Sequence, residues 1–167
     1  MELTQERLKE LLNYDQETGV FTWLERNDKR FNSRFSGKKA GRINSEGYIH
    51  ILIDKNEYKA HRLAFLYITG SFPKDQVDHI NSIRSNNKWS NLRESTHSEN
   101  QQNQKKAFKS NKSTGVLGVY FYEKTNRFRA HIGINKKDVT LGWFKTLDDA
   151  SKAYIDAKRK FHPFGML

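Results

Sequence analysis

The chain has 167 residues, with 30 lysines and arginines against 19 acidic residues, a formal net charge of +11 and a pI of about 9.8. This length is enough for one ordinary domain or two small ones, and the excess of positive charge favours a polyanionic partner such as nucleic acid. The sequence contains 0 cysteines, which excludes disulfides and thiolate zinc sites.

The start of the chain lacks the basic segment and apolar run of a signal peptide. No segment approaches the roughly 20 apolar residues that are needed to cross a bilayer. We therefore expect an intracellular protein without a membrane partner.

The first part of the chain predicts short alternating helices and strands. Residues 4–13 have the apolar spacing of one helical face, and residues 19–24 are rich in the β-branched and aromatic side chains of a strand. A basic loop is expected over residues 26–34. Residues 47–53 alternate as a strand and are predicted to pair with residues 57–60 through a turn at residues 54–56.

A core helix is predicted next, over residues 61–69, and Gly70 and Pro73 would end it. His61 and Arg62 stand at its start. They could serve catalysis or contact DNA, but a histidine that caps the helix and makes ordinary hydrogen bonds is the favoured interpretation.

The centre of the chain predicts a strand, a polar loop, a second strand and a polar helix. Asp78 and His79 should lie at the end of the first strand, because neighbours within a regular strand point to opposite faces. The loop covers residues 82–90, the returning strand covers residues 91–94, and the helix carries Asn100. One carboxylate, one imidazole and one amide can therefore converge.

These side chains suit hydrolysis of a phosphodiester. Asp78 and Asn100 offer hard oxygen ligands for one magnesium or manganese ion, completed by water and phosphate oxygens. His79, left off the metal, can accept a proton from water at physiological pH. Each signal is weak alone, but Asn91 lies twelve positions after His79, and Asn100 nine positions after Asn91. That order and spacing favour the catalytic interpretation.

Residues 101–113 contain four lysines and no acidic residue. A flexible, solvated linker is the plain interpretation; we favour a linker that lies along DNA, because lysines gain free energy from counterion release on contact with phosphates. Arg84 and Arg93 are further candidate DNA contacts. The linker lysines are Lys105, Lys106, Lys109 and Lys112.

The C-terminal part predicts a three-stranded antiparallel sheet over residues 116–122, 127–134 and 139–144. Residues 146–149 have the form of a capping box, and the alanine-rich helix that follows would cover one face of the sheet. The other face would stay open for groove insertion, because the major groove admits β structure. Its candidate contacts are Tyr120, Tyr122, Arg127, Arg129 and His131.

The central part resembles the HNH endonucleases, specifically the phage homing endonucleases encoded by or near group I introns. The resemblance spans about residues 15–105, and its main motifs are residues 77–81, 86–87, 89–93 and 98–100.

This resemblance implies a ββα-metal nuclease module in which His79 matches the general base and Asp78 and Asn100 match the metal ligands. Asn91 matches the central asparagine that braces the loop. The last motif position is Asn100, where the family name has a histidine. The cysteine pairs that bind structural zinc in some relatives are absent, so no zinc is expected.

The C-terminal part is similar to the DNA-binding domain of plant Apetala-type, ethylene-response-factor regulators. The motifs are residues 118–120, 127–132, 141–144 and 149–154. The resemblance implies that strand residues enter the major groove, which adds Trp143 to the candidates. Packing of Trp143 beneath the helix is an equally weighted alternative.

We predict an α+β protein with an N-terminal region and nuclease domain in residues 1–100, a basic linker in residues 101–113 and a DNA-binding domain in residues 114–167. The predicted function is a site-specific, divalent-metal-dependent endonuclease on double-stranded DNA, which nicks as a monomer. The family resemblance implies a phage- or intron-encoded protein in the host cytoplasm. A non-catalytic DNA-binding regulator is the main alternative, and an RNA-binding protein is the second.

Overall fold

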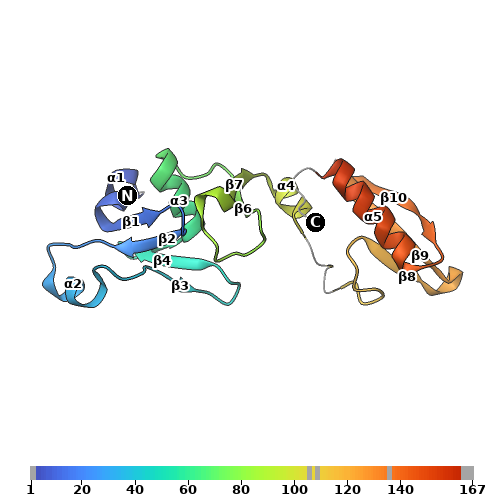
Figure 1. Ribbon diagram of the computed structural model, residues 1–167, viewed down its shortest axis with the longest axis horizontal. Helices are drawn as coiled ribbons and strands as arrows, with labels where there is room; N and C mark the ends of the chain where they lie inside the picture. The colour runs from blue at the N-terminus through green and yellow to red at the C-terminus, as the bar shows by residue number, and fades with distance from the viewer. Residues whose placement is uncertain (1–2, 105–106, 108–109, 135–136, 163–167) are drawn as a thin grey trace. The chain divides into compact units, whose positions relative to one another are not determined.

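The computed structural model describes residues 3–104, 107, 110–134 and 137–162. The chain divides into two compact units, Met1–His97 and Ser98–Leu167, and Figure 1 labels most of their helices and strands. Each unit combines helices with small antiparallel sheets, so the predicted α+β class is confirmed.

The first unit opens with helix α1, Gln5–Leu11, which leads directly into the hairpin of β1, Leu12–Asp15, and β2, Val20–Trp23. Thr4 caps the helix, since its side chain accepts a hydrogen bond from the Arg7 amide at 3.2 Å. Both predicted elements are confirmed, although the helix ends earlier than expected because β1 begins at once.

The expected basic loop is partly wrong, because residues Lys29–Phe35 form helix α2. Asp28 caps this helix by accepting hydrogen bonds from the amides of Arg30 and Phe31 at 2.9 and 3.0 Å. The Arg26 guanidinium also lies over the Phe31 ring, 3.8 Å from its centroid. These local contacts give a helix to a segment without a broad apolar face.

A three-stranded sheet in the described residues follows, with β3, Arg42–Ile43, β4, Ile49–Ile53, and β5, Asn56–Lys59. The predicted turn lies between β4 and β5, but it is one residue shorter than expected, because Asn56 already pairs with Ile53 in β5. Both central residues, Asp54 and Lys55, have positive φ, at 46° and 68°, as a two-residue hairpin turn with the twist of its strands requires.

Helix α3, Ala60–Thr69, is the predicted core helix, and Gly70 ends it with a φ of 81°. Its N-cap is Lys59, which makes no side-chain capping bond. The expectation that His61 caps the helix is therefore wrong; this histidine lies inside the first turn, and its ring is buried.

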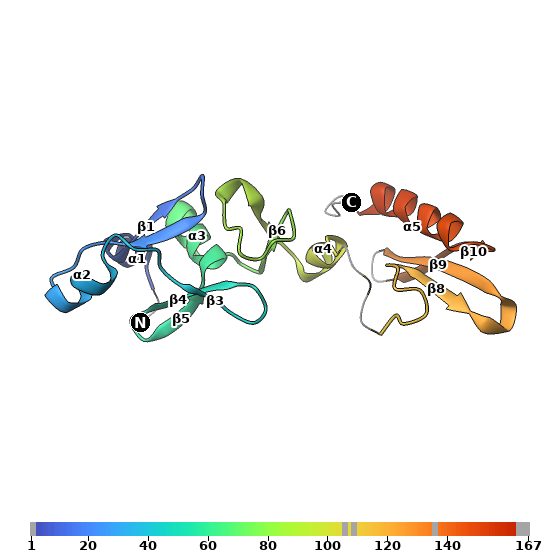
Figure 2. The same cartoon turned by 60° about the horizontal axis from the view of Figure 1, so that its bottom comes forward.

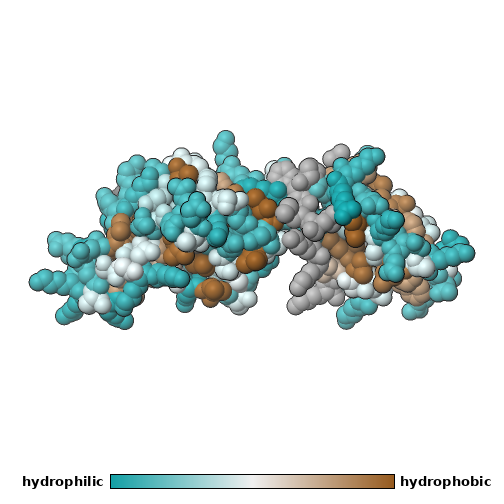
Figure 3. Space-filling view, in the orientation of Figure 1, coloured by the Kyte–Doolittle hydropathy of each residue, from teal (hydrophilic) through white to brown (hydrophobic). Residues whose placement is uncertain are grey.

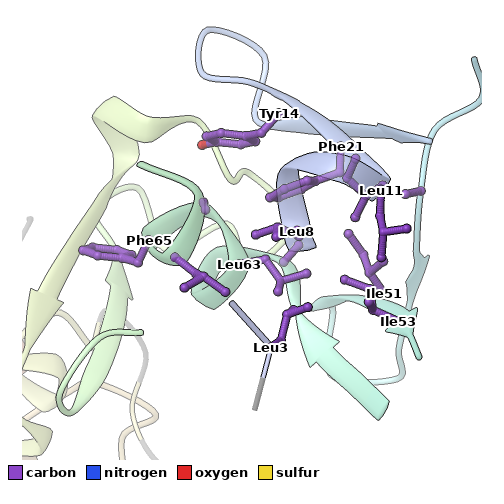
Figure 4. Packing of buried hydrophobic residues seen from close by; sticks show 14 of the residues in the cluster. Leu3, Leu8, Leu11, Tyr14, Phe21, Ile51, Ile53, Leu63 and Phe65 are labelled. Carbon is purple, nitrogen blue, oxygen red and sulfur yellow. The ribbon is translucent and has the colours of Figure 1, made fainter. Parts of the chain in front are cut away.

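Side chains from α1, the first hairpin, β4 and α3 form one hydrophobic core, which Figure 4 shows from close by. Leu8, Leu12 and Leu63 are fully buried at its centre. The Tyr14 ring lies at the rim of the cluster and stacks on Phe21 at a centroid distance of 4.6 Å. This core is the rigid base on which the central hairpin is mounted.

The central hairpin consists of β6, Gln76–His79, and β7, Leu92–Ser95, which pair antiparallel, and a 3-10 turn, Trp89–Asn91, precedes β7. Helix α4, His97–Gln102, follows. This order is the predicted strand, loop, strand and helix.

The second unit contains β8, Val119–Tyr122, β9, Arg127–Ile134, and β10, Lys137–Phe144, in the order β10-β9-β8. A 3-10 turn, Glu123–Thr125, joins the first two strands. Helix α5, Leu147–Phe161, lies along one face of the sheet (Figure 2), as predicted.

The capping of α5 explains where that helix begins. The Thr146 side chain accepts a hydrogen bond from the Asp149 amide at 3.2 Å and donates one to the Asp149 carboxylate at 2.7 Å. Gly118 lets the chain pass close to α5, since a Cβ there would come within 2.1 Å of the Tyr154 ring. The core of this unit lies between α5 and β9.

Hydrophilic residues predominate on the visible surfaces of both units (Figure 3), in keeping with a mean hydropathy of −0.90. Among the described residues, no helix combines the length and apolar character that a bilayer-spanning segment requires.

Candidate functional site

Asp78 and His79 lie at the end of β6, where the strand gives way to the loop, as predicted. Both side chains belong to residues that are only 4% exposed. Antiparallel pairing sets Asp78 opposite Arg93 and His79 opposite Leu92. The hairpin therefore gives each side chain a fixed cross-strand neighbour.

The Asp78 carboxylate is held by an arginine. Arg93 donates from Nε and Nη2 to Asp78 Oδ2 at 2.9 and 2.6 Å, and the arginine side chain is 25% exposed. An ion pair this short at a buried carboxylate fixes the rotamer of both side chains. Arg93, which we predicted to contact DNA, thus orients Asp78, the predicted metal ligand, through two of its guanidinium nitrogens.

The His79 imidazole is held by an asparagine from the loop. Its Nε2 lies 3.0 Å from Asn87 Oδ1, and the bond is buried. Burial lowers the pKa of His79 below its ordinary value, and the Arg84 charge also lowers it, whereas the Asn87 bond and the Asp78 charge raise it. His79 is therefore neutral at physiological pH and able to accept a proton.

Two aromatic rings contact His79. The His61 ring meets it edge to face at a centroid distance of 5.0 Å, and the Tyr48 ring lies 6.1 Å away. Burial lowers the pKa of His61 to about 3, and the charges of Lys59 and Arg62 act in the same direction. His61 is therefore a neutral ring beside His79.

Arg62, the neighbour of His61, makes hydrogen bonds that stabilise the fold. Its guanidinium donates to the carbonyl oxygens of Asp75 and Pro73 at 2.9 and 3.1 Å. These bonds tie α3 to the segment that enters β6, so they help to set the start of the hairpin.

The loop between β6 and β7 is closed by Asn91. Its Oδ1 accepts from the Asn81 amide at 2.9 Å, while its Nδ2 donates to Asn81 Oδ1 at 3.0 Å and to the Asn86 carbonyl at 2.7 Å. The Ile80 amide also donates to the Asn91 carbonyl at 3.0 Å. One buried side chain thus joins both ends of the loop.

Two cationic side chains lie over the Tyr48 ring, which also contacts His61 and His79. Lys59 Nζ is 4.6 Å from its centroid and Arg84 Cζ is 4.9 Å away. Arg84 was a predicted DNA contact, and Lys59 was not singled out. Only the fold brings β5 and the loop together here, because 25 positions separate the two residues in the sequence.

A divalent ion fits the chemistry of Asp78. Its carboxylate is a hard anionic donor, and the bonds from Arg93 to Oδ2 do not use up the acceptor capacity of a carboxylate. Over the described ranges, no cluster of three or more His, Cys, Asp or Glu side chains is poised to hold a metal. Amide, water and phosphate oxygens are the other ligands that suit such an ion. Asn100, the predicted partner ligand, lies in α4 and belongs to the second unit.

In the second unit, the sheet face opposite α5 carries the predicted groove contacts. Tyr120 and Tyr122 on β8 pair with Arg129 and Arg127 on β9. Trp143 pairs with Arg129 from the other side, is 44% exposed and meets the Tyr122 ring at 4.9 Å. Of the two alternatives for Trp143, packing beneath the helix is excluded.

This face also contains an acidic residue that the sequence reasoning missed. Asp138 accepts a hydrogen bond from Arg129 Nη2 at 2.8 Å and pairs with His131 Nδ1. The His131 and Arg129 bonds lower the pKa of Asp138. Asp138 therefore remains ionised and offsets positive charge on the face.

Of the four linker lysines, the structure describes one. Lys105, Lys106 and Lys109 lie outside the described residues, and Lys112 is exposed in a turn.

Comparison with family models matches residues 58–102 to a family described as HNH endonuclease. Among solved structures, the chain is similar to one titled "DNA binding and cleavage by the HNH homing endonuclease I-HmuI", with 25% identity and a TM-score of 0.42. The match covers 56% of this chain and 51% of that chain, so it spans about half the length of the solved chain. No curated protein matches. The segment that matches the HNH endonuclease model, residues 58–102, includes Asp78, His79, Asn87 and Asn91.

Proposed function

We propose that the protein is a divalent-metal-dependent DNA endonuclease that hydrolyses phosphodiester bonds at specific sites, as homing endonucleases do. The observation that carries the proposal is the pairing of a neutral, buried His79 with an adjacent, oriented Asp78 carboxylate inside the segment that matches the HNH family. The net charge of +11 supports a nucleic-acid substrate.

In this mechanism, His79 accepts a proton from the attacking water. The water oxygen forms a bond to phosphorus while one phosphorus–oxygen ester bond breaks, and the leaving oxygen takes a proton from water. Asp78 and Asn100 are the proposed ligands of one magnesium or manganese ion, which would offset negative charge on the phosphate when bound. Arg84 and Lys59 are proposed phosphate contacts, since both cations lie beside the ring that contacts His79.

The second unit is proposed to hold the DNA in register. Tyr120, Tyr122, Arg127 and Trp143 form an aromatic and basic face on a sheet whose other side is covered by α5. Such a face suits insertion in the major groove, and the resemblance to Apetala-type domains points the same way. Lysines of the linker would add sequence-independent contacts to phosphates. We propose a monomer that nicks one strand, because the described part of the chain carries one candidate nuclease site.

The test is incubation of the protein with a supercoiled plasmid library that carries random inserts, with magnesium, with manganese and with a chelator. New DNA ends, mapped on both strands by sequencing, are expected only with the metal, on one strand and at recurring sequences. A non-catalytic regulator would retard the DNA in gels and create no ends. Competition between duplex DNA and structured RNA at the same salt concentration decides between nucleic acids.

A further inference from the structure

Asn87 is almost completely buried, at 1% exposure, although it belongs to a polar loop. Its Oδ1 lies 3.0 Å from His79 Nε2. Within the described residues, Asn87 Nδ2 has no hydrogen-bond partner. Burial of an amide nitrogen without a hydrogen-bond partner costs free energy. This cost indicates that the one hydrogen bond of the Asn87 side chain, to His79, has a functional role.

The backbone of Asn87 is clamped against the first hairpin. The Tyr14 hydroxyl donates to the Asn87 carbonyl oxygen at 2.6 Å. Gly19, with a φ of 72°, approaches so closely that a Cβ would come within 2.3 Å of the Asn87 carbonyl carbon. The next turn is also tied there, because the Trp89 amide donates to the Gln16 carbonyl at 3.0 Å. The hydrophobic core thus fixes the position from which Asn87 reaches His79.

We propose that Asn87 is the positioning residue of the nuclease site: its Oδ1 accepts a hydrogen bond from His79 Nε2–H and thereby sets the tautomer in which Nδ1 is the basic nitrogen. This inference rests on the proposed function and deepens it. A neutral imidazole has one protonated and one basic nitrogen, and a fixed acceptor selects between them. The same logic lets a carboxylate orient the histidine of a serine protease triad.

The rings around His79 complete the arrangement. His61 meets the imidazole edge to face, and the Tyr48 ring is tilted to it at a centroid distance of 6.1 Å. These rings restrict sliding of the imidazole, but a ring contact cannot select a tautomer. A directional hydrogen bond does so, and Asn87 supplies one.

The first experiment measures the tautomer without DNA. Nitrogen NMR spectra of the full chain, labelled at histidine, report which ring nitrogen carries the proton at about pH 8, where His79 is neutral. The His79 signals are identified by their absence in His79→Gln. We expect Nε2–H in the wild type and a loss of this preference in Asn87→Leu, which keeps the size of the side chain and removes the acceptor. A wild-type Nδ1–H tautomer, or an unchanged tautomer in Asn87→Leu, overturns the proposal.

The second experiment measures single-turnover cleavage of a DNA fragment that the wild type cuts. Asn87→Leu is expected to lower the rate constant by about 10²- to 10⁴-fold, the range for loss of an orienting partner, with DNA affinity within about twofold of wild type. Asn87→Asp keeps an acceptor in the same place and is expected to restore the rate to within about tenfold. Asn13→Leu, at an exposed position of β1, is the matched control and should cut normally.

Unfolding curves for each variant separate loss of fold from loss of positioning. A folded Asn87→Leu that cuts at the wild-type rate, or a folded Asn87→Asp as inactive as Asn87→Leu, overturns the proposal. If the wild type cuts no DNA under any condition, the proposed function fails, while the NMR result still decides whether Asn87 sets the tautomer of His79.

Discussion

Replacement of His61 by phenylalanine tests the buried environment beside His79. His61 is 5% exposed, and its Nδ1 has no hydrogen-bond partner among the described residues, so its burial disfavours the charged form. The structure lowers its pKa to about 3 from an ordinary value of 6.5. The unfolded chain therefore binds a proton at this position below about pH 6.5, while the folded chain does not until about pH 3.

The sign and size of the effect follow from this difference. Between the two pKa values the unfolded state holds more protons, so stability rises with pH and is lost as the pH falls below about 6.5. The slope is about 1.4 kcal/mol for each pH unit. As the pH falls from 7 to 5, His61 should therefore lower the unfolding free energy of the N-terminal unit, Met1–His97, by about 2 kcal/mol. His61→Phe should lose this part of the pH dependence, whatever constant offset the new ring introduces.

The assay is urea unfolding followed by tryptophan fluorescence at several pH values. Trp143→Phe, introduced both with and without His61→Phe, removes the tryptophan of the second unit, so Trp23 and Trp89 report the first unit alone. The quantity to compare is the change in unfolding free energy between the two pH values. Equal changes with and without the His61→Phe substitution would refute the reasoning, because they would mean that the His61 ring titrates normally in the folded state.

Three further predictions concern the hairpin and the sheet face. Asn91→Ala removes the bonds that close the central loop and should lower the unfolding free energy of the first unit by about 2–4 kcal/mol in the same urea assay. Asp138→Asn removes the charge that partly neutralises Arg129, so DNA affinity should rise and its logarithm should fall more steeply with the logarithm of salt concentration, by a slope of up to about 1; an unchanged slope would count against DNA contact by this face. Asp78→Ala should abolish cleavage, and retained metal-dependent cutting by the purified variant would remove Asp78 from the mechanism.

Local patterns in the sequence predicted most of the elements. The helix pattern and Gly70 defined α3, the alternation and tight turn defined β4 and β5, and Thr146 marked the start of α5. These features are local, since they depend on periodicity and on the conformations that single residues allow. Helix α2 was missed because its stability comes from an aspartate cap and a cation over a ring, not from an apolar stripe.

The site could be predicted only in part. Asp78 and His79 stood out because their residue types suit hydrolysis, whereas Asn87, although it belongs to the 86–87 motif, gave no sign of its contact with His79. Asn87 reaches His79 because Tyr14, from the first hairpin, holds the Asn87 backbone in place, and this contact between distant segments is visible only in the structure. Asp78 pairs with Arg93 because of the register of β6 and β7. That register cannot be read from the sequence of two such short strands. His61 contacts His79 although 18 positions separate them in the sequence, so this tertiary contact has no local signal.

The central claim is that His79 takes the proton from the attacking water. The most direct measurement is single-turnover cleavage of a susceptible DNA fragment by His79→Ala, with magnesium present and with DNA affinity measured in parallel. We predict an unchanged affinity and a rate constant lowered by about 10²- to 10⁴-fold, the contribution of a general base. Cleavage by this variant at the wild-type rate would contradict the account.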